Sequence, residues 1–372
     1  MKRSMVRMVL AASVLLPICA ATLAAPAKPS KSQIDAVMAE YDRADGPGCA
    51  LSVVRNGAVA YENGYGMANL EHHVPITPDT VFYIASVSKQ FTAAAVALLA
   101  EEGKISLQDD LRKYVPEMPD YGKPIAIHHL IHHTSGLRDY LNLWDQSHQS
   151  FADSISELQA IEMIARHSGL EFPTGDKYQY SNSNYMLLSL IVKRASGMSL
   201  RQYAEEKMFK PLGMRHTHFH DDRTMIVPNR ASAYFKRDAK DGDKLGLFQT
   251  SFDLVGDGGL LTTVRDLVLW DRNYYHNVLG QRGQGLIDQL TSTEPLNDGS
   301  ANSYAFGLQI GEYNGFKSVS HGGSFIGYRS MLMRIPERRL SVLMLCNAAE
   351  ADTGKLSKQI VDLYLGTGQK QK

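Results

Sequence analysis

The segment from Val81 to Gly103 constrains the fold of this chain more than any other. It opens with a strand-like apolar run, residues 81–85, and continues into an alanine-rich stretch, residues 91–100, of high helix propensity. Gly103 follows at the kind of position where helices commonly end in glycine. This order predicts a strand that turns directly into a helix, with residues 86–89 at the start of the helix.

The residues at that start are Ser86-Val-Ser-Lys89, the single Ser-x-x-Lys of the chain. Residues at i and i+3 share a helix face, so Lys89 is expected beside Ser86. A hydroxyl activated by an adjacent base is what nucleophilic acyl transfer requires. Taken alone, the motif also fits an ordinary N-cap serine with a surface lysine, because about one Ser-x-x-Lys is expected by chance at this length.

A second motif, Tyr180-Ser-Asn182, lies between Pro173-Thr-Gly175 and the apolar helix pattern of residues 185–192. This position predicts a loop that leads into a helix. Alone, Tyr180 would be a packed aromatic side chain and Asn182 a helix N-cap.

A third motif, His321-Gly322-Gly323-Ser324, precedes the last strand-like runs of the chain. Glycines in a strand allow another backbone, such as that of a substrate, to approach closely. The three motifs together supply a hydroxyl, a lysine, a phenol and a glycine-rich strand edge, and this set predicts acyl-transfer chemistry.

With five supporting segments, the motifs resemble the serine hydrolase family of class C β-lactamases, DD-peptidases and related esterases. The resemblance covers roughly residues 33–366 and includes Asn63-Gly-Tyr-Gly-Met-Ala-Asn69, Leu130-Ile-His-His-Thr-Ser-Gly-Leu137, Pro211-Leu-Gly-Met214, Gly258-Gly-Leu-Leu-Thr-Thr263 and Ser320-His-Gly-Gly-Ser324. It implies an α/β fold in which an antiparallel sheet flanked by helices carries an inserted helical lobe. The active site is then expected in the cleft between the two lobes.

The resemblance also assigns roles. Ser86 would be the nucleophile, and Asn182 would orient Lys89 or the substrate. The backbone N–H groups of Ser86 and Ser324 would form the oxyanion hole. Either Lys89 or Tyr180 would be the base that takes the serine proton.

Tyr180 can act near neutral pH only if its pKa falls from about 10. An ammonium about 4 Å from a phenolate contributes roughly 4 kcal/mol at an effective dielectric constant near 20, or about three pKa units before desolvation. A Tyr180 phenolate held by Lys89 is therefore one expectation, and a Lys89 base is the other.

The third motif departs from the Lys-Thr-Gly that the family usually carries. His321 replaces a permanent cation, and Gly322 replaces a hydroxyl. If His321 titrates near 6.5, its attraction for a substrate carboxylate should fade as the pH rises through that value. Efficient turnover of β-lactams is accordingly not expected.

The pattern of elements predicts a split domain within residues 33–372. Residues 33–107 and 251–372 are expected to form the α/β lobe, and residues 108–250 the helical lobe. An amphipathic helix near Ile34 is followed by strands at 49–54 and 58–67 around Asn56-Gly57, a strong hairpin signal. Four more strands are expected at 304–313, 316–320, 330–334 and 340–345, and a last helix at 355–365.

Residues 1–25 read as a signal peptide, with a basic start, an apolar centre and small residues near Ala25. An uncleaved anchor is the alternative, but the apolar run is short for a bilayer span. Residues 26–32 read as a linker. The expected product is a secreted, periplasmic protein with no stable membrane span after cleavage.

Cleavage would leave Cys49 and Cys346, both in apolar strand-like runs. Buried free thiols are the expectation from the residues. Because the related family places its first and last strands near each other, a Cys49–Cys346 disulfide is the alternative that the resemblance leaves open.

The histidine-rich segments 128–133 and 216–220 have spacings that a metal site could use. No glutamate-containing metalloprotease motif accompanies them, so neither a metal nor a cofactor is expected. The formal net charge is zero, which disfavours nucleic acid as a partner.

The combined prediction is a secreted serine hydrolase that works through an acyl-enzyme on esters or amides. The substrates would be small molecules or peptides, including D-amino peptides, peptidoglycan fragments and, less efficiently, β-lactams. A D-alanyl-D-alanine carboxypeptidase or endopeptidase and a class C-like β-lactamase are alternatives. Two further alternatives are not working enzymes: a penicillin-binding module that is acylated without turnover, and an inactive binder of wall fragments.

Overall fold

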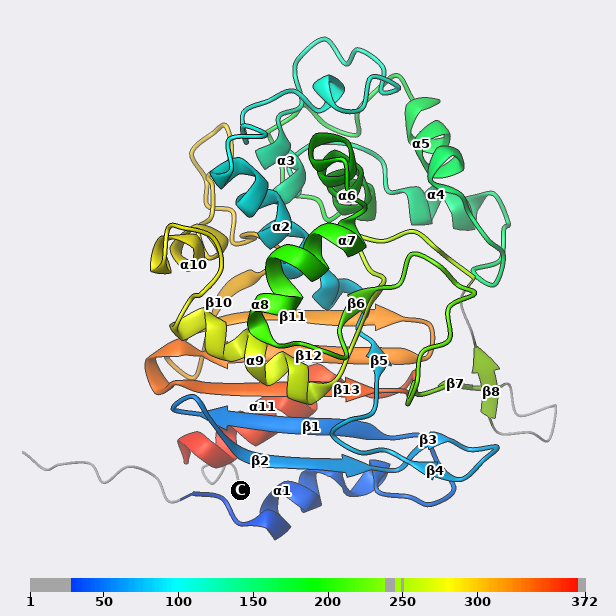
Figure 1. Ribbon diagram of the computed structural model, residues 1–372, viewed down its shortest axis with the longest axis vertical. Coiled ribbons are helices and arrows are strands. Elements are labelled where there is room, and N and C mark those ends of the chain that lie inside the picture. Colours follow the sequence, from blue (N-terminus) through cyan, green and yellow to red (C-terminus); the bar gives the residue numbers. More distant parts are fainter. Residues whose placement is uncertain (1–27, 238–244, 249–250, 367–372) are drawn as a thin grey trace, which may run out of the picture.

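A six-stranded antiparallel sheet forms the base of the molecule in the computed structural model, which describes residues 28–237, 245–248 and 251–366 (Figure 1). Its order is β10-β11-β12-β13-β1-β2. The strands are β1 Cys49–Arg55, β2 Ala58–Tyr65, β10 Gln309–Tyr313, β11 Phe316–Phe325, β12 Tyr328–Ile335 and β13 Leu340–Cys346. The first and last strands of the chain are thus adjacent in the middle of the sheet.

Local sequence accounts for the strand ends. Asn56 and Gly57 have φ values of 54° and 78°, as the tight β1–β2 turn requires. β10 begins at Gln309, not at residue 304 as expected, because Gly307 turns the chain with a φ of 70°. β11 extends to Phe325, five residues beyond the expected end, so the third motif lies within a strand.

The two faces of the sheet build two cores, because successive side chains of a strand point to opposite faces. Leu51 and Val342 pack with helices α1 Lys31–Met38 and α11 Thr353–Leu365. Ala50 and Leu343 join the larger core under α9 Val264–Tyr275. Figure 1 shows α9 in front of the sheet and α11 behind it. α1 begins inside the expected linker, since Ser30 caps it.

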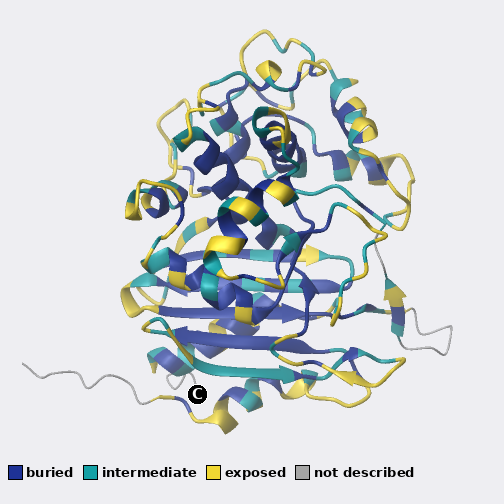
Figure 2. Cartoon of the chain, viewed as in Figure 1, coloured by how far each residue is buried: buried dark blue, intermediate teal, exposed yellow. Residues whose placement is uncertain are grey.

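The upper part of the molecule is mostly helical. Two long helices, α2 Lys89–Glu101 and α6 Asn182–Ser196, lie against each other at its centre and are dark with buried residues in Figure 2. The other helices are α3 Ile127–Ile131, α4 Tyr140–Gln146, α5 Glu157–Ala165, α7 Leu200–Ala204, α8 Lys210–Leu212 and α10 Gln284–Leu290. Short helical turns are η1 Ala39–Tyr41, η2 Ala85–Ser88, η3 Leu111–Lys113, η4 Glu205–Phe209 and η6 Pro336–Arg338.

The described part of the chain has seven further, short strands: β3 Met67–Asn69, β4 Val74–Pro75, β5 Phe82–Tyr83, β6 His218–Phe219, β7 Ala233–Lys236, β8 Leu245–Phe248 and β9 Leu260–Thr262. The three-stranded sheet β5-β9-β6 matters most for the site, because β5 leads directly into η2 and α2. The expected signal peptide, residues 1–25, lies outside the described residues. Among the described residues, none of the helices has the length and apolar character needed to cross a membrane.

The expectation of free buried thiols is wrong, because Cys49 and Cys346 form a disulfide. The two residues are direct partners in the register of β1 and β13. The residues alone could not show that these strands pair, since 297 positions separate the two cysteines.

A buried ion pair ties α9 to the sheet. The Arg334 side chain of β12 donates from Nε to Asp271 Oδ1 at 2.6 Å, and both side chains are 1% exposed. The guanidinium also lies 4.9 Å from the ring centroid of Tyr274. A buried pair contributes little net stability against an apolar pair, but removal of one partner leaves an isolated charge.

We therefore expect Asp271→Ala to lower the free energy of unfolding by about 3–5 kcal/mol, measured by urea denaturation. The matched control is Glu162→Ala, which breaks an exposed pair with Arg166 on α5. It should cost no more than about 1 kcal/mol. Equal losses of stability in the two variants would contradict the conclusion that Arg334 depends on Asp271 as its buried partner.

Candidate active site

Ser86 lies in η2, directly after a strained backbone position. Ala85 has a φ of 48°, and a left-handed residue with a side chain costs roughly 1–2 kcal/mol. Its neighbours in the turn are buried, whereas Ser86 is partly exposed. The helix was expected to start at residues 86–89. In the structure, η2 is a single 3₁₀ turn over Ala85–Ser88, and α2 begins at Lys89. Ser86 is thus the partly exposed residue of a turn that is otherwise buried.

Lys89 is fully buried beside that hydroxyl. Its Nζ lies 3.1 Å from Ser86 Oγ, 2.9 Å from Asn182 Oδ1 and 2.6 Å from the Asp257 carbonyl oxygen. The last two are pure acceptors, so the neutral amine would use its two N–H groups on them and keep its lone pair for the Ser86 proton. Burial lowers the pKa of Lys89 to about 8, although the carboxylates of Asp257 and Asp139 raise it.

The position of Asn182 is fixed by Asp139, which the sequence reasoning did not single out. Asp139 Oδ2 accepts from the Asn182 Nδ2 group at 2.9 Å and also from its backbone N–H. This leaves Asn182 Oδ1 facing Lys89. Asp139 also caps α4, accepting from the N–H groups of Leu141 and Asn142, so one carboxylate connects two helix starts to the site.

Tyr180 lies on the loop before α6, as expected, but its environment does not favour a phenolate. The Lys89 Nζ sits over the Tyr180 ring, 4.8 Å from the centroid. Burial raises the pKa of Tyr180 above its usual value, more than the hydrogen bond with Ser86 lowers it. The expected phenolate near neutral pH is therefore corrected to a neutral phenol, because burial and then the carboxylates of Asp257 and Asp139 raise the pKa of Tyr180.

His321 begins the part of β11 that extends past the end of β10, whose pairing stops at Ser320. Its Nδ1–H donates to the Gly322 carbonyl at 2.6 Å, which leaves Nε2 to accept from the Tyr304 hydroxyl at 2.9 Å. Burial and the charge of Lys89 lower the pKa of His321 to about 4. The expected titration near 6.5 is therefore wrong, and the imidazole is neutral at physiological pH.

Gly323 is required by close packing of β11 on η2. A Cβ at this position would lie 2.2 Å from both the Ile84 carbonyl oxygen and Ser330 Oγ. This contact sets the strand directly against the turn that carries Ser86. Ser324 is the next residue and is exposed at the site.

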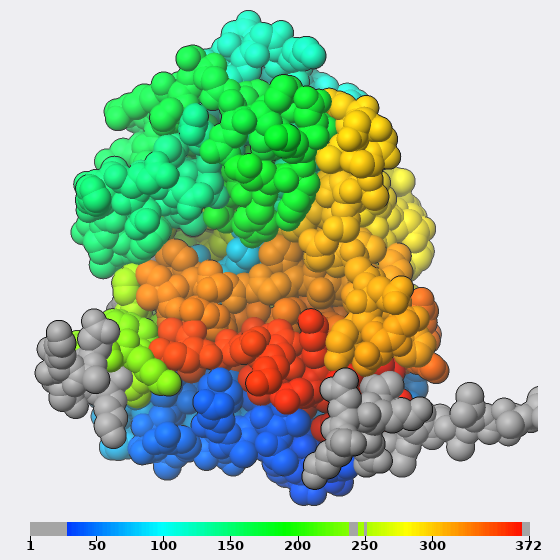
Figure 3. Space-filling view, turned by 180° about the vertical axis from the view of Figure 1, so that it is seen from behind, coloured from blue at the N-terminus to red at the C-terminus, as the bar shows by residue number. Residues whose placement is uncertain are grey.

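Ser86 lies between two cavities. The first has a volume of about 190 Å³ and includes several aromatic residues in its wall; Ser86, Tyr180, Asn182 and Ser324 also line it. The second, of about 460 Å³, is lined by Ser86, Tyr180, the four residues of the third motif, Arg329, Ser330 and residues 351–354, which include Asp352. Figure 3 shows a hollow between the green helical part and the orange β11 region, with light-blue atoms of the earlier chain at its floor. The three motifs thus meet in one cleft.

Asp257 is a further site residue that sequence reasoning missed. It precedes the Gly258-Gly-Leu segment, and nothing in a single sequence shows that this loop folds back onto Lys89 over 168 positions. Tyr304, which holds His321, gave no sequence signal either.

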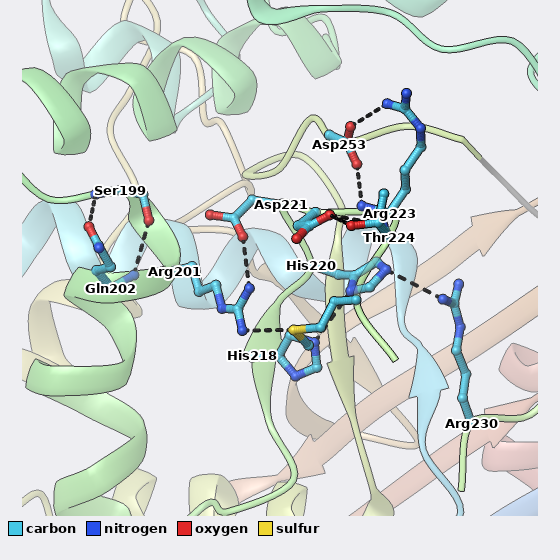
Figure 4. A network of polar contacts seen from close by, with 12 residues as sticks. Ser199, Arg201, Gln202, His218, His220, Asp221, Arg223, Thr224, Arg230 and Asp253 are labelled. Atoms are coloured by element: carbon cyan, nitrogen blue, oxygen red, sulfur yellow. Dashed lines mark hydrogen bonds and ion pairs between the residues drawn. The ribbon is translucent and has the colours of Figure 1, made fainter. Parts of the chain in front are cut away.

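The two histidine segments do not assemble a metal site. His128 pairs with Glu294, and His132 Nδ1 lies 2.8 Å from the Tyr304 carbonyl oxygen. In Figure 4, His218 and His220 lie beside Arg201 and Arg230; burial first, and then these cations, lower the pKa of both imidazoles. Within the described ranges, no three His, Cys, Asp or Glu side chains converge in a way that could hold a metal ion.

Comparison with known proteins agrees with this geometry. Residues 34–364 match the family model described as Beta-lactamase. The chain belongs to the β-lactamase family of serine hydrolases. Its sheet and helices match those of penicillin-binding-protein-like folds, as the resemblance implied.

A D-aminopeptidase of Gluconobacter oxydans is 30% identical over 334 residues, which are 89% of this chain but 61% of that relative. The chain thus spans less than two thirds of this relative's length. The octameric penicillin-binding protein homologue of Pyrococcus abyssi is 27% identical, with a TM-score of 0.77 over 90% of this chain and 76% of that one. A D-amino acid amidase of Ochrobactrum anthropi SV3 shares the fold at 20% identity, with a TM-score of 0.75 over 90% of this chain and 99% of that one.

The environment of His321 gives a direct prediction. Because its folded pKa is depressed to about 4, the imidazole should stay neutral, as the Nδ1–H tautomer, from about pH 5 to 8. Nitrogen NMR of the imidazole checks this. The exposed His72 offers a control resonance in the same spectra. A titration of His321 near 6.5 would contradict the assignment.

Proposed function

We propose that this protein is a serine hydrolase that is acylated at Ser86 and cleaves amide and ester bonds of small amino-acid derivatives and peptides, with D-amino acid amides as the favoured class. The observation that carries the proposal is the placement of Lys89, buried and 3.1 Å from Ser86 Oγ. The similarity to a D-aminopeptidase supports the amide class and the D configuration.

The acylation step follows from these contacts. Ser86 Oγ attacks the substrate carbonyl carbon while its proton passes to the lone pair of Lys89, so that an O–C bond forms. Collapse of the tetrahedral intermediate breaks the C–N or C–O bond, and the leaving group takes up a proton, directly or through the Tyr180 hydroxyl. Water then attacks the acyl-enzyme, releases the acid and restores Ser86.

The remaining roles are part of the same proposal. Asn182 and the Asp257 carbonyl hold Lys89, and Tyr180 acts as a neutral proton donor and acceptor. The backbone N–H groups of Ser86 and Ser324 would bind the oxyanion, which needs donors fixed before the reaction. The close contact of Gly323 with η2 supports this role, because it keeps the two segments together.

Export to an oxidising compartment is also proposed. The Cys49–Cys346 disulfide supports it, since disulfides persist mainly in secreted and periplasmic proteins. The basic and apolar character of residues 1–25 agrees with a signal peptide.

A carboxypeptidase of D-alanyl wall peptides is the second candidate, and one observation favours it. Arg329 lines the second cavity together with Asp352, and it could supply the permanent cation that the neutral His321 does not. Two results would support this candidate. Activity on a D-alanyl-D-alanine peptide should exceed activity on its C-terminal amide, and Arg329→Gln should abolish the activity on the peptide.

The nucleophile is tested by covalent labelling. Ser86→Ala should abolish labelling by a fluorophosphonate and turnover of nitrophenyl esters, because the attacking oxygen is removed. Ser183→Ala is a matched control, since Ser183 lies in α6 outside both cavities. Intact-protein mass spectrometry reads the adduct, and full labelling of Ser86→Ala would refute the proposal.

The base is tested by the pH dependence of acylation. Because the folded pKa of Lys89 is depressed to about 8, the neutral amine increases as the pH rises through that value. The acylation burst should rise toward a plateau above about pH 9 in the wild type. Tyr180→Phe should be slower but keep the same midpoint, and a rise that continues past pH 10 would instead identify the phenol as the base.

A further inference from the structure

Among the described residues that line the aromatic cavity beside Ser86, one has a charged side chain. We call this cavity the aromatic pocket; besides Ser86, Tyr180, Asn182 and Ser324, it is lined by Tyr83, Ala85, Tyr140, Leu141, Phe252, Leu254, Asp257, Gly258 and Phe325. Five aromatic residues and two leucines contribute to this wall beside its polar groups. Asp257 is the charged residue, and the acylation step described above uses only its backbone carbonyl.

In the described part of the chain, the Asp257 carboxylate forms no close ion pair, although the charge of Lys89 acts on it. The side chain is 7% exposed, and its Oδ2 accepts from the Tyr140 hydroxyl at 3.1 Å. Its Oδ1 accepts from no other described residue, and no Lys, Arg or His nitrogen of the described ranges forms an ion pair with it. Lys89 contacts the Asp257 backbone oxygen instead. A buried carboxylate without a close ion pair is costly, and the Tyr140 hydrogen bond and the charge of Lys89 are the interactions shown that offset this cost.

The charge of this group is suited to a cationic ligand. Burial raises the pKa of Asp257 to about 6, while Lys89 lowers it, so the carboxyl is mostly ionised at pH 7.5. Tyrosine faces attract cations as well, through the ring quadrupole. The pocket thus combines a negative charge with aromatic walls.

We propose that the aromatic pocket binds the α-ammonium of the substrate's acyl half, with Asp257 as its hydrogen-bond partner and the aromatic walls around the adjoining side chain. The inference rests on the proposed function and narrows its substrate class to amino-acid amides and esters with a free amino group. Asp257 is then the residue that determines specificity for this class.

The acyl half is favoured over the leaving group for a chemical reason. The nitrogen of a leaving amine is uncharged while it is part of the amide bond. The charged group closest to the attacked carbonyl carbon is therefore the α-ammonium, one carbon away. Ser86 and Asp257 line the same cavity, so a substrate acylated at Ser86 would have this group beside the carboxylate.

The first experiment compares substrates. D-Phenylalanine p-nitroanilide carries the ammonium, and 3-phenylpropionyl p-nitroanilide lacks only that group. In the wild type, kcat/KM should be about 10- to 100-fold higher for the first, the range of a hydrogen bond between charged groups. Equal values for the two substrates would overturn the inference without any variant.

Variants locate the effect. Asp257→Asn should remove most of this preference while changing kcat/KM for the uncharged analogue much less. Asp253→Asn makes the same change four residues earlier, in a carboxylate that pairs with Arg223 at 2.6 Å and does not line the aromatic pocket. This control should keep the preference. An equal loss on both substrates in Asp257→Asn would mean that Asp257 acts only through Lys89.

A binding measurement separates this inference from the proposed function. In titration calorimetry, 2-phenylethylammonium should bind the wild type and Ser86→Ala more tightly than 2-phenylethanol, and Asp257→Asn should abolish the difference. This readout needs no turnover. Selective binding without fluorophosphonate labelling would refute the acyl-enzyme and keep the ammonium pocket, whereas labelling without selective binding would refute the pocket alone.

Discussion

The burial of one lysine beside one serine organises this site. Lys89 has no exposed surface, and its Nζ is surrounded by Ser86 Oγ, the Asn182 amide oxygen and the Asp257 carbonyl oxygen. Burial disfavours the ammonium, so the same packing that fixes the amine also brings its pKa toward the range where a base is useful. Three segments far apart in sequence must meet for this to happen.

The sheet and the turn at Ala85 make that meeting possible. β11 lies against η2 so closely that only glycine fits at position 323, and β12 anchors the turn through the Ser330 hydroxyl, which donates to the Ile84 carbonyl at 2.7 Å. The left-handed Ala85 is a local cost that these contacts offset. The position of Ser86 and the strain at Ala85 are therefore consequences of strand packing more than of the helix that follows.

Much of this arrangement was readable from the sequence, and the limits have physical causes. The Asn56-Gly57 hairpin and the helix after Ser86 depend on local preferences, so both were predictable. The disulfide, the buried Arg334–Asp271 pair and the Asp257 loop depend on contacts across more than 60 residues, which no local pattern encodes. The protonation states of Tyr180 and His321 were misjudged for a related reason: desolvation depends on the completed fold, whereas the sequence suggests only which charges are near.

The Cys49–Cys346 bridge has a mechanical consequence. The motif residues from Ser86 to Ser324 all lie inside the covalent loop that it closes, while α1 and most of the C-terminal segment lie outside. Tension applied between the two ends of the described chain would pass from β1 to β13 through the sulfur atoms and would bypass the loop. The cleft is thereby shielded from pulling forces at either end, such as those from a tether or a partly engaged protease.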